Sequence, residues 1–323
     1  AVLQGGLSNQ SFQRKDYFAQ PANPESDKEN VGGGYLKGGA NYNISDRSNV
    51  FFNAGLISRQ PNFDAVFPNY ANNVNPDLQN EEIKSFELGY GYVTNNFKVN
   101  VNAYSTVWGN RFVTRSLSNS QGVDGFAQFK NIDVVHNGIE VESSWNPFDN
   151  LRFKGMLSIG DWRYTKDFEA ELFDDNQQSI GTGTLYLKDA KVGDAAQFVS
   201  YLEADYRLGS KLNVDLGYRF VDNLYADYSI TDSEFTQPDN AGALKLPSYG
   251  LLDLGTTLRF NLFGNDATFR VNINNLLDTT YIAESNSNIH ADASSTTWNG
   301  VDTRNYVWFG FGRTWNASLK YRF

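Results

Sequence analysis

Apolar and polar residues alternate strictly at the end of the chain. Counting back from the C-terminus, the apolar positions are Phe323, Tyr321, Leu319, Ala317 and Trp315, and the residues between them are polar. Because successive side chains of a β-strand point to opposite faces, this period of two predicts a strand with one apolar and one polar face. A terminal aromatic residue on the apolar face is typical of a strand that meets lipid.

The same alternation recurs upstream and predicts about twelve antiparallel strands. It is weak over residues 1–18 and clear afterwards. The further apolar stretches lie at residues 32–44, 50–56, 86–92, 97–107, 139–145, 151–159, 198–208, 212–220, 252–260 and 269–273. Short turns alternate with long polar loops, and Gly209-Ser210 is expected to be a two-residue hairpin turn. The loops are expected at about 60–82, 116–125, 167–195, 221–247 and 284–304.

The lengths of the connections indicate how the strands are arranged. Soluble β-sandwiches also alternate, but they do not normally place all short turns on one side and all long loops on the other. Outer-membrane barrels are built in this way, with short periplasmic turns and longer extracellular loops. The sequence therefore predicts an all-β chain, namely a transmembrane antiparallel up-and-down β-barrel. Its short turns and C-terminus are expected to face the periplasm.

Aromatic residues stand where strands lead into the short turns, with the parity of the apolar face. An aromatic ring of side chains at the inner membrane interface predicts this placement. Aromatic residues also favour strands in general, but that preference does not explain a shared parity at six strand ends. The predicted interface girdle consists of Tyr42, Tyr92, Trp145, Tyr206, Phe260, Tyr321 and Phe323.

Composition narrows the class of protein. The chain has 323 residues, a net charge of −10 and no cysteine. No run reaches the roughly 20 apolar residues of a membrane-spanning helix. The acidic balance argues against nucleic acid as a partner. The polar strand face carries many charges of both signs, which would be too costly against lipid, so it is expected to meet water or a polar plug.

Candidate catalytic and metal sites are weak. His136 and His290 are the only histidines, no serine is spaced to act as their nucleophile, and both are interpreted as incidental polar residues. The acidic residues of 167–175 lack the spacing of a calcium loop, which favours a solvated loop. The run Gly32-Gly33-Gly34 precedes a strand rather than a helix, which excludes a phosphate-binding loop. We therefore expect no catalytic residue, no metal ligand and no cofactor.

Exposed aromatic residues of the long loops are candidate ligand contacts, because such rings can stack on a sugar or chelate ring. These rings could equally belong to the interface girdle or pack against neighbouring residues. The candidates are Tyr70, Trp298 and Trp308.

Several segments, in this order and spacing, resemble the barrel of TonB-dependent outer-membrane receptors, in particular those of Bacteroidetes type. They are Arg59-Gln60-Pro61, Asn75-Pro76-Asp77-Leu78, Phe86-Glu87-Leu88-Gly89-Tyr90, Trp108-Gly109-Asn110-Arg111, Asn137-Gly138-Ile139-Glu140-Val141-Glu142, Leu246-Pro247-Ser248-Tyr249, Val271-Asn272-Ile273-Asn274-Asn275-Leu276-Leu277 and Gly312-Arg313-Thr314-Trp315.

The resemblance implies a barrel of 22 strands with an N-terminal plug domain inside it. The twelve expected strands match its C-terminal half, so residues 1–323 are expected to lack the plug and the first barrel strands. The implied function is energy-coupled import of a scarce ligand, such as an iron–siderophore, cobalamin, a glycan or a peptide. The implied partners are the TonB–ExbB–ExbD complex, outer-membrane lipid or lipopolysaccharide, and a surface lipoprotein.

The last strand also resembles the signal read by the barrel-assembly machinery. Asn316, Tyr321 and Phe323 are the expected signal residues, although Ser318 stands where glycine is common. Girdle anchoring alone would explain the same aromatic residues.

Two other interpretations stay open. The chain could be a complete twelve-stranded outer-membrane channel or surface enzyme, in which the first and last strands pair directly and charged side chains crowd a narrow lumen. It could also be a soluble β-rich adhesion or binding domain, whose apolar faces are buried against a second sheet.

Overall fold

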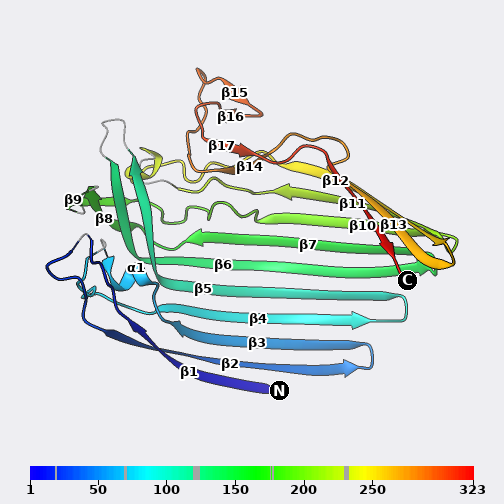
Figure 1. The fold of residues 1–323 in the computed structure, drawn as a ribbon, viewed down its shortest axis with the longest axis horizontal. Coiled ribbons are helices and arrows are strands. Elements are labelled where there is room, and N and C mark those ends of the chain that lie inside the picture. The colour runs from blue at the N-terminus through cyan, green and yellow to red at the C-terminus, as the bar shows by residue number, and fades with distance from the viewer. Residues whose placement is uncertain (19, 69–70, 119–123, 175, 177, 229–232) are drawn as a thin grey trace.

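The computed structural model describes residues 1–18, 20–68, 71–118, 124–174, 176, 178–228 and 233–323. Its main feature is one large antiparallel sheet of long strands (Figure 1). Twelve strands follow one another across it: β1 (Val2–Phe12), β2 (Glu29–Ser45), β3 (Ser48–Arg59), β4 (Glu81–Val93), β5 (Phe97–Ser118), β6 (Asp124–Phe148), β7 (Leu151–Tyr164), β10 (Phe198–Leu208), β11 (Leu212–Asp222), β12 (Tyr249–Leu262), β13 (Asn265–Asn274) and β18 (Thr314–Tyr321).

Each of these strands pairs with the next one along the path. The order β1-β2-β3-β4-β5-β6-β7-β10-β11-β12-β13-β18 is the up-and-down topology that the alternation predicts, so the twelve expected strands are confirmed. Strands β1 and β18 form the two edges of the described sheet, and they do not pair with each other. A closed twelve-stranded barrel is therefore not what these residues form.

Short turns and long connections lie at opposite ends of the sheet, and the C-terminus lies at the short-turn end (Figure 1). The prediction for residues 209–210 was wrong in detail. Leu208 pairs with Leu212, so three residues form this turn, and Gly209 adopts a left-handed φ of 65°. Two-residue turns lie elsewhere, between the pairs Ser45–Ser48, Phe148–Leu151 and Leu262–Asn265. In the last of them Phe263 and Gly264 both have positive φ (52° and 87°), as a type I′ hairpin turn requires.

The long connections contain more regular structure than the sequence predicted. The hairpin β8 (Phe168–Asp174) and β9 (Ser179–Leu185) replaces part of the loop expected over 167–195. In β8 Phe168, Ala170 and Phe173 are buried, whereas Glu169 between them is exposed. The other short elements are α1 (Phe63–Val66), a 3-10 helix (Ser233–Thr236), β14 (Ile282–Ser285), β15 (Thr297–Trp298), β16 (Val301–Asp302) and β17 (Val307–Phe309).

Strands β5 and β6 also run further than expected. They continue into the loop predicted at 116–125, where Ser118 pairs with Asp124. At its other end β6 runs to Phe148, so its turn into β7 consists of Asp149 and Asn150.

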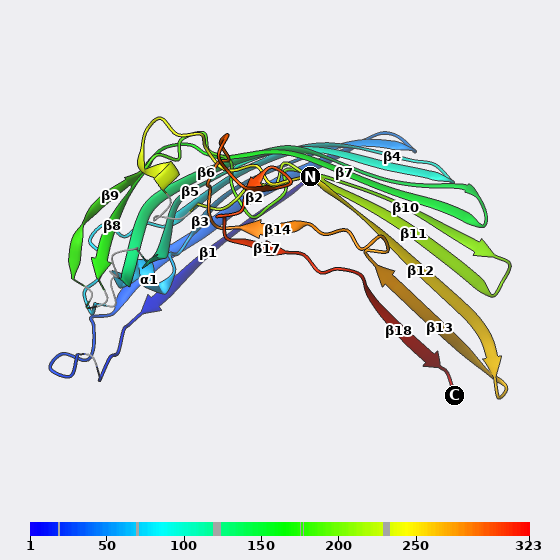
Figure 2. The same cartoon turned by 90° about the horizontal axis from the view of Figure 1, so that it is seen from above.

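The long strands form a single layer, which curves into an arch with one concave face (Figure 2). The opposite face exposes the alternating apolar residues, among them Leu36, Leu56, Phe86, Leu88, Ile139, Leu202, Leu216 and Leu319. A contiguous apolar surface of this extent needs a membrane or a partner to cover it. The other sheets of the described residues are two short pairs, β14 with β17 and β15 with β16, whereas a β-sandwich needs two large facing sheets.

Packed hydrophobic cores occur at the long-loop end. The largest gathers Phe129, Val134, Tyr164, Phe168 and Phe235 from β6, β7, β8 and the β11–β12 connection. A second holds Leu224, Leu246 and Ile282. A third packs Phe12 on Val66, the last residue of α1, and on Phe67. These cores fix the loops relative to the sheet. No helix among the described residues is long and apolar enough to cross a membrane.

Candidate functional site on the concave face

The seven predicted girdle residues lie at the short-turn end or at the C-terminus. Tyr42 is 70% exposed and Trp145 47% exposed. The Trp145 ring stacks on Phe153 with centroids 5.7 Å apart, and the Tyr321 ring lies 6.3 Å from that of Phe323. Tyr92, Tyr206 and Phe260 occupy the matching places in β4, β10 and β12. This arrangement suits an interface girdle, which stays a prediction.

The remaining candidates from the sequence do not gather in one place. Asn316, a predicted assembly-signal residue, accepts a hydrogen bond on Oδ1 from Asn272 Nδ2 at 2.8 Å. Trp298 packs edge-on against Phe309 at 5.2 Å, whereas Trp308 is 51% exposed. Tyr70 lies outside the described residues. A role in ligand contact therefore stays a prediction for these three aromatic residues.

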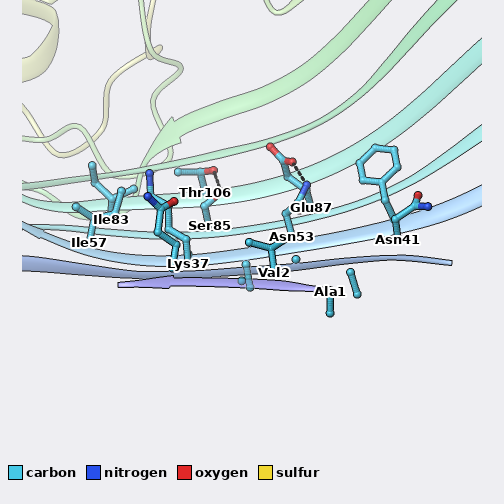
Figure 3. A pocket seen from close by; sticks show the side chains of 17 residues that line it. Ala1, Val2, Lys37, Asn41, Asn53, Ile57, Ile83, Ser85, Glu87 and Thr106 are labelled. Carbon is cyan, nitrogen blue, oxygen red and sulfur yellow. Dashed lines mark hydrogen bonds between the residues drawn. The ribbon is translucent and has the colours of Figure 1, made fainter. Parts of the chain in front are cut away.

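A hollow of about 770 Å³ lies on the concave face of β1 to β5 (Figure 3). Its wall is mixed, because Ile57 and Ile83 stand beside polar side chains. Asn53 Nδ2 donates to Glu87 Oε2 at 3.1 Å, and the hydroxyl groups of Ser85 and Thr106 are 3.0 Å apart. Its volume falls within the range of small-molecule sites, which also combine apolar walls with a few polar groups.

A network of charges occupies the concave face of β7 to β13. Arg270 donates from Nη1 and Nη2 to the two carboxylate oxygens of Asp215, each at 2.9 Å, and from Nη1 to Thr257 Oγ1 at 2.9 Å. Lys154 Nζ contacts Glu203 Oε1 at 2.7 Å. These bonds join neighbouring and next-nearest strands. The concave face thus carries charged side chains of both signs, and the water or plug expected to cover it stays a prediction.

A basic group lies on the same face near the short turns. Lys211, Arg259, Lys320 and Arg322 surround a hollow of about 570 Å³ together with Asp266. Arg259 makes no side-chain ion pair among the described residues.

A second polar group lies where the concave face meets the long connections. Arg59 Nη2 pairs with Glu81 Oε2 at 2.6 Å, and Trp108 Nε1 donates to the same carboxylate oxygen at 3.2 Å. The Arg111 guanidinium lies 4.6 Å from the Trp108 ring centroid. Nearby, the His136 ring packs edge-on against Trp162 at 5.3 Å. We call these residues, together with Tyr104, the rim cluster.

Sequence reasoning did not single out the rim cluster. It used Trp108 and Arg111 only as part of a resemblance, and it treated His136 as incidental. The available signal was parity, because Arg59, Glu81 and Trp108 all have the parity of the polar face of their strands. Their meeting depends on strand register, which pairs Arg59 with Glu81 and Ile83 with Trp108.

The long connections hold a carboxyl group with a raised pKa. Desolvation by the surrounding loops, together with the charges of Asp227 and Glu284, raises the pKa of Asp194 to about 6, and Arg115 opposes this shift. Asp227 in turn pairs with Arg115 at 2.8 Å. No group of three or more His, Cys, Asp or Glu side chains among the described residues is arranged to hold a metal ion.

Comparison with known proteins supports the fold. The family model described as TonB dependent receptor-like, beta-barrel, matches residues 2–276. No curated protein matches the chain. Among solved structures, the copper transporter OprC aligns with a TM-score of 0.65 and 16% identity, over 98% of this chain and 44% of its own.

Two further structures align similarly. The FrpB iron transporter from Neisseria meningitidis gives a TM-score of 0.60 and 14% identity, over 99% of this chain and 43% of its own. The siderophore receptor PiuA from Acinetobacter baumannii gives 0.59 and 16%, over 92% and 37%. Identities this low support a shared fold alone. The chain spans less than half the length of each of the three.

Proposed function

The chain belongs to the TonB-dependent receptor-like β-barrel family, and we propose that it forms the C-terminal part of an energy-coupled import receptor. The family consists of outer-membrane transport receptors rather than enzymes. The observation that carries the proposal is a single-layer arch with an apolar convex face and a charged concave face. A lipid-facing wall around a polar lumen has these two faces.

In this proposal the short turns and the C-terminus face the periplasm, and the long connections face the outside. The aromatic girdle at the short-turn end supports that orientation, because aromatic belts lie at membrane interfaces. The packed cores at the other end support it too, since exposed loops that receive a ligand need a defined shape.

We further propose that a plug domain and additional strands, outside residues 1–323, complete the lumen. The open edges of β1 and β18 support this proposal, and so does coverage of only 44% of the copper transporter's chain. The rim cluster and the hollow of Figure 3 then lie in the vestibule, where a ligand arrives from outside. TonB, with ExbB and ExbD, would act on the plug and not on the described strands.

The ligand class is proposed more broadly, as a scarce nutrient such as an iron–siderophore, cobalamin, a glycan or a peptide. The structures that align include a copper transporter, an iron transporter and a siderophore receptor. Outer-membrane lipid or lipopolysaccharide and the barrel-assembly machinery are proposed partners, and a surface lipoprotein is a further one.

Two measurements test the proposal. The intact mass of the protein in isolated outer membranes should be well above 36.3 kDa. Uptake of its ligand should stop when TonB is deleted and return when TonB is restored. An intact mass of 36.3 kDa together with ion conductance that ignores TonB would favour a small channel and overturn the proposal.

A further inference from the structure

The hairpin of β8 and β9 ends in an open strand edge that lies outside the barrel path. Among the described residues β9 pairs with β8 alone, and β8 in turn pairs with the end of β6. Figure 2 shows β9 as the outermost strand at the long-loop end. The strands proposed to complete the barrel would continue from β1 and β18, so they do not use this edge. An unpaired edge presents backbone N–H and C=O groups that can pair with another chain.

The edge of β9 is regular and lacks the residues that usually block one. Its residues Gly181–Leu185 pair in unbroken register with Phe168–Leu172 of β8, and the register shift of the hairpin lies at the turn end, before Gly181. Natural edge strands are often protected by lysine, by proline or by a bulge. The sequence of β9 is Ser-Ile-Gly-Thr-Gly-Thr-Leu, which contains no charged residue and no proline.

The edge is also held in place by the loops behind it. Leu185 and Leu187 belong to the largest core, and each is only 1% exposed. Between them, the Tyr186 backbone N–H donates to the Phe235 carbonyl at 2.8 Å, and Asn240 Nδ2 donates to the Tyr186 carbonyl at 3.0 Å. A strand that is already ordered loses little conformational entropy when a partner pairs with it.

One face of the hairpin is acidic. Glu169 pairs with Thr184 and Glu171 pairs with Thr182, so these four side chains share a face. Neither glutamate makes an ion pair within the part of the chain that the structure describes, and β8 and β9 contain no lysine or arginine. A strand added to β9 would lie two strand spacings, roughly 10 Å, from β8. The threonines between are short, so a long cationic side chain on the added strand can reach the carboxylates.

The other face of β9 has room for apolar side chains. An added Cβ at Gly181 would meet no atom within 4 Å, and at Gly183 it would meet only Leu172 Cδ1, at 3.7 Å. Leu172 itself is half-buried. Apolar side chains of an added strand can therefore cover the two glycines and this leucine, as neighbouring strands do within a sheet.

We propose that the outer edge of β9 is a docking site for an extended segment of another protein, in which basic and apolar residues alternate and which adds to the hairpin as a further strand. Strand addition of this kind takes its affinity from backbone hydrogen bonds and its specificity from alternate side chains. A second copy of this chain fits less well, because two paired β9 strands would gather the glutamates of both copies on one hairpin surface without a cation. The inference goes beyond the import function and uses only the proposed orientation, in which the long connections face the outside.

The test uses the purified full-length receptor in nanodiscs of a zwitterionic lipid. The probe is a short synthetic peptide, blocked at both ends, in which lysine and valine alternate, and calorimetry gives its Kd. Glu169→Gln combined with Glu171→Gln should raise Kd roughly threefold or more, because two cross-strand charge pairs are lost. Asp64→Asn is the matched control, since Asp64 is an exposed carboxylate of α1 at the same end of the sheet, and it should leave Kd unchanged.

Strand addition makes a second prediction that charge attraction alone does not make. A peptide methylated at every amide nitrogen keeps its charge but cannot donate backbone hydrogen bonds, and its Kd should be at least about tenfold higher. The unmodified peptide should slow hydrogen exchange at the amides of β9 and leave those of α1 unchanged.

Three results overturn the inference. They are equal binding of the methylated and unmodified peptides, equal binding of a peptide in which glutamate replaces lysine, and a β9 edge whose amides are already protected in the receptor alone. In the last case the rest of the receptor's own chain or a second copy covers the edge, and the mass of the Thr184→Lys variant in solution separates these two occupants. TonB-dependent uptake decides the import function independently, because peptide binding to the purified receptor does not require TonB.

Discussion

The proposed lipid-facing wall makes a depth-dependent prediction for arginine substitutions. Val271 and Val214 both have the parity of the apolar face, but they lie at different depths. Val214 pairs with Tyr206, a girdle residue, so it is at the interface. On β13 the residue paired with the girdle residue Phe260 is Ala267, four positions before Val271.

The magnitude follows from this geometry. Four residues at about 3.3 Å each, on a strand tilted by about 45°, place Val271 roughly 9 Å inside an apolar band about 25 Å tall. That is near the middle of the band. Val271→Arg should therefore lower the free energy of unfolding by about 2–4 kcal/mol, and Val214→Arg should lower it by about 0–1 kcal/mol.

The assay is urea unfolding of the full-length protein in lipid vesicles, followed by tryptophan fluorescence, with heat-modifiable migration as the check on insertion. The control is Asn272→Arg, which places the same charge on the neighbouring residue of the concave face and should change the unfolding free energy little. Two results would refute a lipid-facing convex surface. One is an equal loss of unfolding free energy for arginine at positions 214 and 271, and the other is a loss at position 272 as large as that at position 271.

Three further predictions come from single contacts. Arg270→Gln should lower the free energy of unfolding by about 1–3 kcal/mol in the same urea assay, because it leaves the Asp215 carboxylate without its charged partner; an unchanged midpoint would show that water replaces the pair. Gly138→Ala should displace the Tyr104 ring and alter the near-ultraviolet circular dichroism, and an identical spectrum would contradict the close approach. The raised pKa of Asp194 means that the folded loops bind its proton more tightly than the unfolded chain does. The stabilisation of the folded loops by the protonated Asp194 carboxyl is thus fully present below about pH 4, and this stabilisation is lost as pH rises through about 6. Hydrogen exchange of these loops should show that loss, and Asp194→Asn should abolish it; a pH profile that survives the substitution would contradict this origin.

The sequence alone determined the strands and their faces. A period of two fixes which residues share a face, and this local rule depends only on the pleat of a strand. It gave the twelve-strand path, the placement of Tyr42 or Trp145 beside short turns, and the charged face that holds Arg270. The rule did not find β8, because acidic residues between Phe168 and Phe173 suggested a solvated loop. It could not have found β9, whose sequence Ser179–Leu185 has no apolar alternation.

Only the tertiary structure decided which polar residues meet. Arg59, Glu81 and Trp108 are far apart in the chain, and they come together because hairpin register places them across neighbouring strands. Turn length sets that register, and a single residue changes it, as the three-residue turn at 209–211 illustrates. Arg111 is a further case, because only the fold places its guanidinium against the Trp108 ring. An alternating pattern specifies the two faces of the wall, but the contacts across strands depend on a register that the pattern leaves open.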